Sequence, residues 1–392
     1  MRKLNIFIIW GNFPPVIGGG SSRGYRVFKE LANRGHKINV FVGKIPGTPS
    51  HERLSKNLEL YRVPPSFHYP LRKGVYVRIL NHFVILIRYL ALFPLLVYLH
   101  LREPANLMIV EATNWEFSPK IMKFLKINTL MISPWVMFKK IFRLSVFVYF
   151  TNMWYANEIQ IKGEVDYAER ILIVDSWMEK RLVELGVKKE IFYVPVCIDS
   201  NKNRITPDNN IVLYVGRLSK ERGCDVLIKS IPYIKEKIKD VEVVLVGGGA
   251  ERENLMKLAE DLDVTENLKF VREVDSRKID SVYASVKPKV LVNPLRLPGI
   301  GNTTIEALAY GIPVIKSKIP GYDEPVIEEG KNGYLFKLDD PENLAEKIIA
   351  TLRNTGNWRA LSDNALKTSK EFELERIVDR LEQILLRDFN SP

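Results

Sequence analysis

The sequence predicts an α/β protein made of two Rossmann-like, doubly wound domains, and three observations lead to this prediction. The chain has 392 residues, which is enough for two domains of ordinary size. Hydrophobic residues make up 46% of it, as in a globular protein with sizeable cores. Short, fully apolar strands alternate with helical patterns throughout, which is typical of parallel sheets covered by helices on both faces.

The first half begins with a strand, a glycine-rich loop and a helix. LNIFIIW precedes GNFPPVIGGGSS and the helical pattern RGYRVFKELANRG. We interpret LNIFIIW as a buried strand and not as a signal peptide, because the apolar stretch is brief and no small-residue cleavage site follows. The other strands expected in this half are KINVFV, LELYRV, NLMIVEA, NTLMIS, RILIVDS and IFYVPV.

The second half repeats the pattern after a polar stretch, residues 199–210. Its expected strands are NIVLYVGRL, VEVVLVGGG, NLKFV, PKVLVNP and IPVIKS. We therefore expect a first domain over residues 1–200, a second over 201–375, and a C-terminal helix over 376–392 that could pack back on the first domain. Ligands of such sheets lie beyond the carboxyl ends of the strands, so we expect the site in a cleft between the two domains.

The net charge of +12 is carried by the first half. Residues 1–200 hold 28 Lys and Arg against 15 Asp and Glu, whereas residues 201–392 hold 30 against 31. A basic domain suits a nucleic acid, an anionic membrane surface or a phosphorylated substrate. Because no nucleic-acid-reading module is recognisable, we expect no nucleic-acid partner.

Cysteine and glutamine usage indicates the compartment and the kind of source organism. The two cysteines, Cys197 and Cys224, have neither metal-ligand nor disulfide spacing, which suits a reducing cytoplasm. Two glutamines among many Lys, Arg and Glu residues favour a thermophilic source. We expect a cytoplasmic protein, and a peripheral position on the inner face of the cell membrane is an alternative.

Residues 79–101 are almost continuously apolar, with Arg88 at the centre and Pro94 beyond it. Three interpretations stay open: a transmembrane helix, which would place Arg88 near mid-bilayer at high cost, a buried core helix, or a helix in the membrane interface. The aromatic run over residues 141–156 favours the third, as do nearby basic residues. These are Arg72, Lys73, Arg78, Lys139, Lys140 and Arg143.

Motifs in the second half point to an anionic ligand. Neither G-x-G-x-x-G after the first strand nor G-x-x-x-x-G-K-[ST] is present, which argues against dinucleotide dehydrogenases and P-loop NTPases. Arg217 and Arg222 follow a strand end, where two cations suit a diphosphate, although they could be surface arginines on a loop. The glycines of residues 247–249 form either a tight strand-to-helix connection or a ligand contact.

The run VLVNPLRLPGIGNTTIEALAYGIPVI, residues 290–315, reads as a strand, a glycine loop, a helix start and a second strand. Gly299 and Gly301 let the backbone approach a ligand, and the free N–H groups of a helix that begins near Thr303 favour a phosphate or a sugar hydroxyl. Thr303 and Glu306 have capping-box spacing, so capping and ligand binding are equally open for Glu306.

Four successive motifs resemble those of retaining glycosyltransferases of family 4, the glycosyl transferases group 1: YVGRLSKERGCDVLI, LVGGGAERENL, NPLRLPGIGNTTIEALAYGIPVI and EEGKNGYLF. The segment NFPPVIGGGSSRGYRVFKELANRGHKINVFV resembles the start of the same family. The likeness covers the second half closely and the first half only at its two ends. It implies the GT-B fold and an enzyme that transfers a hexose from a nucleotide-diphosphate sugar without a bound metal or other cofactor.

The resemblance also implies roles for individual residues. Arg217 and Arg222 would bind the donor's diphosphate, and Glu306 would bind the ribose hydroxyls. The other donor-binding residues would be Gly18, Gly19, Gly216, Gly301, Asn302, Thr303 and Thr304.

The sequence departs from the family pattern in three places. The family's first loop glutamate falls on Pro298, whose side chain cannot accept a hydrogen bond. PVCID, residues 195–199, replaces P-N-G-[VI]-D. The family's acceptor-side histidine is missing, and Glu111, Thr113 or Asn114 could take part there instead.

These observations predict a retaining sugar transferase whose acceptor is a lipid-linked or membrane-presented glycan, since the first domain is basic and rich in apolar segments. A soluble polysaccharide or a small molecule is the alternative acceptor. A non-catalytic, nucleotide-sugar-binding relic is the alternative to an enzyme.

Overall fold

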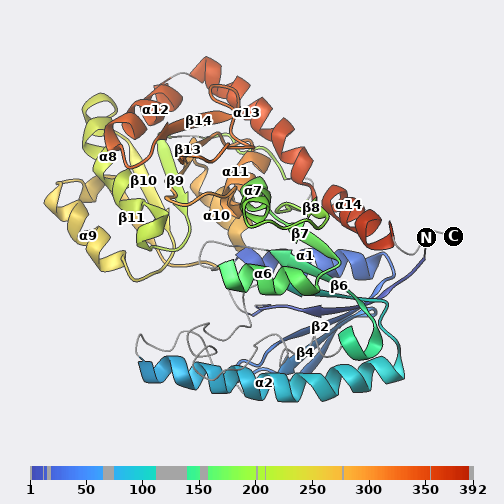
Figure 1. Cartoon of the computed structure of the whole chain (residues 1–392). Coiled ribbons are helices and arrows are strands. Elements are labelled where there is room, and N and C mark those ends of the chain that lie inside the picture. Colours follow the sequence, from blue (N-terminus) through green and yellow to red (C-terminus); the bar gives the residue numbers. More distant parts are fainter. Residues whose placement is uncertain are drawn as a thin grey trace. The chain divides into compact units, whose positions relative to one another are not determined.

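The chain folds into two units, which we call unit 1 and unit 2 (Figure 1). The computed structural model describes residues 2–11, 13–15, 19–64, 75–111, 139–150, 158–199, 202–207, 209–275, 278–353 and 355–387. Unit 1 comprises Met1–Pro195 and Val378–Pro392, and unit 2 comprises Val196–Ile377. The chain therefore enters unit 2 after Pro195 and leaves it within its last helix, α14 (Leu374–Leu386).

Unit 1 contains an eight-stranded sheet in the order β3-β4-β2-β1-β5-β6-β7-β8. Its strands are β1 (Asn5–Ile9), β2 (Lys37–Gly43), β3 (His51–Ser55), β4 (Leu58–Val63), β5 (Leu107–Glu111), β6 (Ser145–Phe150), β7 (Arg170–Ile173) and β8 (Ile191–Tyr193). β3 runs antiparallel to β4, and the other described neighbours are parallel. β1 and β5 are buried along their whole length, which explains their apolar residues without alternation.

Helices cover both faces of this sheet, with α1 and α2 on opposite faces (Figure 1). The helices that belong wholly to unit 1 include α1 (Gly19–Asn33), α2 (Val75–Arg102), α6 (Glu158–Tyr167) and α7 (Ser176–Glu184). Helix α1 packs through Val27, Phe28 and Leu31, which lie on one side of the helix and are at most 2% exposed. The arrangement is the doubly wound one that the sequence predicts.

Unit 2 contains a six-stranded, parallel sheet in the order β11-β10-β9-β12-β13-β14. Its strands are β9 (Ile211–Val215), β10 (Glu242–Val246), β11 (Leu268–Val271), β12 (Val290–Asn293), β13 (Val314–Lys318) and β14 (Gly333–Lys337). Its helices include α8 (Cys224–Lys237), α9 (Arg252–Asp261), α10 (Ile279–Val286), α11 (Asn302–Ala309), α12 (Pro341–Arg353) and α13 (Thr355–Ser369). Helix α8 packs against α12 on one face, and α11 packs against α13 on the other (Figure 1).

Three strands depart from the sequence predictions. β3 and β14 are not among the predicted strands, and β6 corrects the interpretation of residues 145–150, which are part of the expected membrane-contact segment 141–156. Residues 151–156 of that segment lie outside the described residues. β6 lies between β5 and β7 and is buried from Val146 onwards. Its aromatic and β-branched side chains fit a strand that is covered on both faces. The expected strand NTLMIS lies outside the described residues.

Helix α2 covers the apolar segment 79–101, and it is buried on only part of its surface. Leu92 and Leu96 are at most 1% exposed. The large exposed hydrophobic residues of this helix are Ile87 at 49%, Leu90 at 67%, Tyr98 at 59% and Leu101 at 72%. A wholly buried core helix is therefore the wrong interpretation. Across the ranges that the structure describes, no helix combines the length and hydropathy needed to span a membrane.

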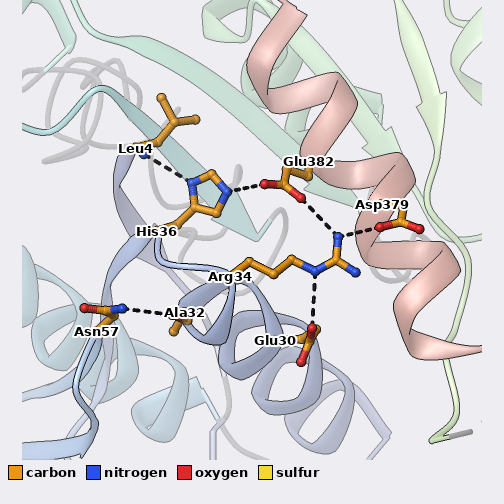
Figure 2. Close-up of polar contacts among 8 residues, drawn as sticks. All are labelled: Leu4, Glu30, Ala32, Arg34, His36, Asn57, Asp379 and Glu382. Atoms are coloured by element: carbon orange, nitrogen blue, oxygen red, sulfur yellow. Dashed lines mark hydrogen bonds and ion pairs between the residues drawn. The ribbon is translucent and has the colours of Figure 1, made fainter. Parts of the chain in front are cut away.

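The last turns of α14 are fixed to the rest of unit 1 by a buried polar cluster (Figure 2). Nδ1 of His36 accepts a hydrogen bond from the backbone N–H of Leu4 at 3.2 Å, so Nε2 carries the proton and donates to Glu382 at 2.8 Å. Arg34 donates from Nη1 to Glu382 at 3.0 Å and to Asp379 at 2.5 Å. Burial alone would raise the pKa of Glu382, but the hydrogen bonds from His36 and Arg34 outweigh it and lower that pKa.

Glu382→Gln is expected to lower the free energy of unfolding by about 2 kcal/mol near pH 7. The amide loses the charge that Arg34 pairs with and turns an N–H toward His36 or Arg34. Because the pKa of Glu382 lies below its ordinary 4.5, the carboxylate's contribution is present above that value and is lost as the pH falls through the lowered pKa. Urea denaturation near pH 7 and at about pH 3 measures both effects.

Glu371 provides the matched control for this prediction. It is 59% exposed and pairs with Arg376, itself 61% exposed, so Glu371→Gln should change the unfolding free energy by less than about 0.5 kcal/mol. Equal losses in the two variants would contradict the role assigned to the cluster.

Candidate functional site

Loops after three neighbouring strands meet at the carboxyl edge of the unit 2 sheet: those after β9, β10 and β12. The loop after β9 presents Arg217, which is exposed and directly follows Gly216. The hydroxyl of buried Tyr214 donates to the carbonyl of Arg217 at 2.8 Å. A Cβ on Gly216 would lie 2.7 Å from that hydroxyl, so glycine is needed for the turn that presents Arg217.

The glycine loop after β10 packs on the backbone of the loop after β9. The N–H of Leu218 donates to the carbonyl of Gly248 at 2.8 Å. A Cβ on Gly247 would lie 1.8 Å from the carbonyl oxygen of Gly216, and a Cβ on Gly249 would lie 2.2 Å from that of Leu218. These glycines therefore serve the tight connection, which is the first of the two interpretations that the sequence leaves open.

Arg222 lies on the same loop as Arg217, at the end of a 3-10 turn, Lys220–Arg222. It is partly buried and is followed by Gly223, the N-cap residue of α8, which has a φ of 67°. A Cβ on Gly223 would lie 2.0 Å from the carbonyl oxygen of Pro294, so the turn fits against the loop after β12 only with glycine. The structure thus brings the two predicted cations together on one loop of the sheet edge.

Arg296 connects the loop after β12 by hydrogen bonds to the turn that carries Arg222. Its guanidinium donates to the carbonyl of Lys220 at 2.5 Å, to Asp225 at 2.9 Å and to Asp339 at 2.6 Å. Burial alone would raise the pKa of Asp225, but the hydrogen bond and the charge of Arg296 outweigh it and lower that pKa. The hydrogen bond to Asp225 in turn raises the pKa of Arg296. An ionised pair therefore holds the two loops together.

Helix α11 begins at Asn302, and its N-cap residue is Gly301 with φ of 77° and ψ of 130°. As a glycine, this N-cap residue has no side chain with which to cap the helix. The capping-box interpretation of Thr303 and Glu306 is therefore wrong, because the cap lies two residues before Thr303. The N-terminus of α11, where the helix dipole is positive, favours an anion.

The predicted donor-binding residues on α11 differ in exposure. Asn302 and Thr303 are partly exposed, and the carbonyl of Thr303 accepts a hydrogen bond from Tyr283 at 3.4 Å. Thr304 is fully buried, and its hydroxyl accepts a hydrogen bond from Asn293 at 3.0 Å. The side chain of Thr304 therefore fixes α11 to β12, and its predicted role in donor binding stays a prediction.

Glu306 is partly exposed and lies beside two tyrosines. The rings of Tyr283 and Tyr310 stack with their centroids 4.9 Å apart. Burial and then the charge of Glu306 raise the pKa of Tyr283. Burial, a hydrogen bond to Asp280 and the charge of Glu306 likewise raise the pKa of Tyr310. A partly exposed carboxylate in this place can accept hydrogen bonds from ligand hydroxyls.

Lys316 holds the backbone of the glycine loop, and no motif in the sequence points to this residue. It lies on β13, is 1% exposed, and donates to the carbonyl of Gly299 at 2.7 Å. Its ammonium also pairs with Glu324, which is 5% exposed. A buried ion pair therefore fixes the backbone next to Pro298, where the family's first glutamate is missing.

The residues predicted in unit 1 are described only in part. Three of them lie outside the described residues: Gly18, Thr113 and Asn114. Gly19 is the first residue of α1. Glu111 ends β5, is 5% exposed, and accepts a hydrogen bond from the backbone N–H of Gly11 at 2.7 Å. The structure thus places Glu111 at the carboxyl edge of the unit 1 sheet, where ligands of parallel sheets lie.

Residues 198–368, which cover most of unit 2, match the family model described as glycosyl transferases group 1. The chain is 30% identical to an uncharacterized glycosyltransferase of Methanocaldococcus jannaschii over 222 residues, 54% of this chain and 57% of the relative. It is 31% identical to a GDP-mannose-dependent alpha-(1-6)-phosphatidylinositol monomannoside mannosyltransferase of Mycolicibacterium smegmatis over 148 residues, 36% of this chain and 38% of the relative. The resemblance that the sequence indicates is confirmed over the matched residues.

The matches to curated relatives are partial, whereas a structural match covers the whole chain. The chain spans about half the length of the curated relatives it matches. Sucrose-phosphate synthase from Thermosynechococcus elongatus has a TM-score of 0.77 and 20% identity, over 100% of both chains. At this identity the likeness concerns the fold alone. The predicted fold class, α/β with two Rossmann-like domains of the GT-B type, is confirmed.

Proposed function

We propose that this chain, whose residues 198–368 match the glycosyl transferases group 1, transfers a hexose from a nucleotide-diphosphate sugar to a hydroxyl acceptor with retention of configuration. One observation carries the proposal: Arg217, Arg222 and the N-terminus of α11 meet at one edge of the unit 2 sheet. Two guanidinium groups and a positive helix end suit a diphosphate. The mycobacterial relative, named for its dependence on GDP-mannose, supports this class of donor.

The proposed chemistry follows from where charge develops. As the bond from the anomeric carbon to the diphosphate breaks, the leaving phosphate gathers negative charge. Arg217, Arg222 and the first N–H groups of α11 stabilise that charge, so no bound metal is required. An oxygen of the leaving phosphate accepts the proton of the acceptor hydroxyl, whose oxygen bonds to the same face of the sugar. Glu306 accepts hydrogen bonds from the ribose hydroxyls and positions the donor.

A screen of nucleotide sugars tests the donor part of the proposal. UDP-, GDP- and ADP-sugars are compared by thermal shift, because a ligand that binds the folded chain raises the apparent melting temperature. Product analysis with the stabilising donor then establishes transfer and the anomeric configuration. Stabilisation by no nucleotide sugar would reject the proposal. Binding without turnover would instead favour the non-catalytic relic, in which Pro298 replaces a carboxylate.

We assign the acceptor to unit 1 and propose that it is a lipid-linked glycan presented at a membrane. The exposed hydrophobic residues of α2 recur at helical spacing on the side opposite Leu92 and Leu96. The ring of Phe142 lies 4.4 Å from that of His100, so exposed Ile141 lies beside the end of α2. Exposed basic residues adjoin these apolar ones in sequence: Arg102, Lys140 and Arg143.

An apolar stripe bordered by cations suits the interface of an anionic bilayer. The mycobacterial relative is named for a phosphatidylinositol mannoside, which is a lipid acceptor.

Replacing Leu90 and Leu101 together with glutamine is expected to weaken binding to anionic vesicles about tenfold, because two exposed apolar side chains no longer enter the interface. Sedimentation with phosphatidylcholine vesicles, with and without phosphatidylglycerol, measures the effect. Val183, which is 60% exposed on α7, gives the control variant Val183→Gln, and its binding should match that of the unaltered chain. Absence of vesicle binding by the unaltered chain would reject the membrane assignment.

A further inference from the structure

Arg23 is a buried cation of unit 1 to which the proposed chemistry gives no role. It lies on α1, one turn from the helix start, and is 5% exposed. Its Nε and Nη2 atoms are both buried, and neither has a hydrogen-bond partner among the residues that the structure describes. Its guanidinium lies 5.4 Å from the centroid of the Tyr149 ring, a contact that stabilises the charge without using these N–H groups.

Other buried arginines of unit 1 have ordinary partners. Arg170, which is 6% exposed, donates to the carbonyl of Ile384 at 2.9 Å and lies 3.4 Å from a carboxylate oxygen of Glu190. Arg62, which is 5% exposed, also has an Nε without a partner among the described residues, but its charge pairs through Nη1 with Glu52 at 2.8 Å. A buried charge without such compensation is costly, so the position of Arg23 calls for a partner that the described residues do not supply.

The two unpartnered atoms indicate which chemical group the partner carries. Nε and Nη2 form one edge of the guanidinium, whose parallel N–H groups match two oxygens of a phosphate or carboxylate. Ser21, two residues earlier on α1 and 2% exposed, has a hydroxyl that is likewise unpartnered within the described ranges. The start of α1 also carries the positive end of the helix dipole. Three features of one helix start therefore favour an oxyanion.

The contacts around Arg23 place its guanidinium near the carboxyl ends of the unit 1 strands, where ligands of parallel sheets lie. A Cβ on Gly24 would lie 2.8 Å from Nε1 of Trp10, so glycine lets α1 approach the end of β1 closely. Trp10 contacts Tyr149, with the ring centroids 5.7 Å apart. Tyr149 on β6 is the register partner of Glu111 on β5. Arg23 therefore lies near the carboxyl ends of β1 and β6, with the predicted acceptor-side residue Glu111 on the strand between them.

We propose that Arg23 binds a phosphate group of the acceptor through its Nε and Nη2 edge. The identity of the ligand as an acceptor rests on the proposed function. Unit 2 already supplies Arg217, Arg222 and the start of α11 for the diphosphate of the donor. Unit 1 is expected to add only the backbone of Gly18 and Gly19 to that site, so the buried cation of unit 1 is assigned to the second substrate. The inference narrows the acceptor to a phosphate-bearing glycan carrier and disfavours neutral oligosaccharides.

Calorimetric titration of the full chain with butyl phosphate tests the assignment, with 1-butanol as the uncharged counterpart and UDP as the probe of the donor site. Butyl phosphate is expected to bind and 1-butanol is not. Arg23→Lys keeps the charge but loses the two parallel N–H groups, and should weaken the binding of butyl phosphate about tenfold. Arg23→Met should abolish detectable binding of butyl phosphate. Both variants should keep the affinity of the unaltered chain for UDP.

Thermal stability separates binding from a structural role. Arg23→Met removes a buried, unpaired charge and should leave the melting temperature unchanged or raise it, whereas the matched variant Arg170→Met should lower it and leave butyl phosphate binding intact. If Arg23→Met fails to fold, Arg23→Lys carries the test.

Three outcomes would overturn the inference. In the Arg23 variants, UDP binding could weaken while butyl phosphate binding stays intact, which would assign the guanidinium to the donor, or the binding of both ligands could stay intact. The third outcome is that the unaltered chain does not bind butyl phosphate. If no nucleotide sugar stabilised the unaltered chain, but butyl phosphate still bound to it in a way that depends on Arg23, only the proposed function would be rejected.

Discussion

Arg217→Ala is expected to lower kcat/KM for the nucleotide sugar by about 100- to 1,000-fold, the usual cost of removing one preorganised donor to a developing oxyanion. The effect should fall mainly on kcat, because the charge on the leaving diphosphate is greatest in the transition state. Arg217→Lys should recover part of the loss, since it restores the charge without the fork. Steady-state kinetics with the donor found in the screen measures all three enzymes.

Arg359, which is exposed on α13, gives the control variant Arg359→Ala. It removes one surface cation of unit 2 and should leave kcat/KM within about twofold of the unaltered chain, a change of under 0.5 kcal/mol. A second contact is checked by Glu306→Ala, which should weaken the binding of the free nucleoside diphosphate because the ribose loses an acceptor. If Arg217→Ala and Glu306→Ala both left turnover unchanged, the donor site would be wrongly assigned.

The strand and helix order of both units could be predicted because parallel strands are buried on both faces and therefore read as continuous apolar runs. The same property led to the wrong prediction of a membrane-contact segment at β6. Its sequence SVFVYF is as apolar and aromatic as a membrane-interface segment, and composition cannot tell a covered strand from an interfacial one. Helix α2 shows the converse, since its exposed stripe is visible only once Leu92 and Leu96 are known to be buried.

The site was predictable where its residues follow strand ends and not where they depend on distant partners. Arg217 and Arg222 stand out because they directly follow a predicted strand. The capping hypothesis for Glu306 depended on the first helical residue, and the observed start at Asn302 removes it. Arg296 pairs with Asp225, 71 residues away, and a separation of that size is not visible in a single sequence.

Lys316→Met is expected to lower the free energy of unfolding by about 3–5 kcal/mol, because it leaves the carboxylate of Glu324 buried without its counter-charge. The carbonyl of Gly299 loses its donor at the same time. Urea denaturation near pH 7 measures the loss. Glu328→Gln is the control, since Glu328 is 57% exposed in a surface pair with Lys331 and should change stability by less than about 0.5 kcal/mol.

The double variant Lys316→Met with Glu324→Leu separates stability from the placement of the donor loop. Replacing a whole buried ion pair by apolar residues of similar size is often neutral, so most of the lost stability should return. The carbonyl of Gly299 stays unanchored, however, and Pro298 offers no side-chain acceptor to hold the loop in another way. The double variant should therefore fold well and still show a raised KM for the nucleotide sugar. A double variant with both normal stability and a normal KM would show that Lys316 has no part in positioning the loop.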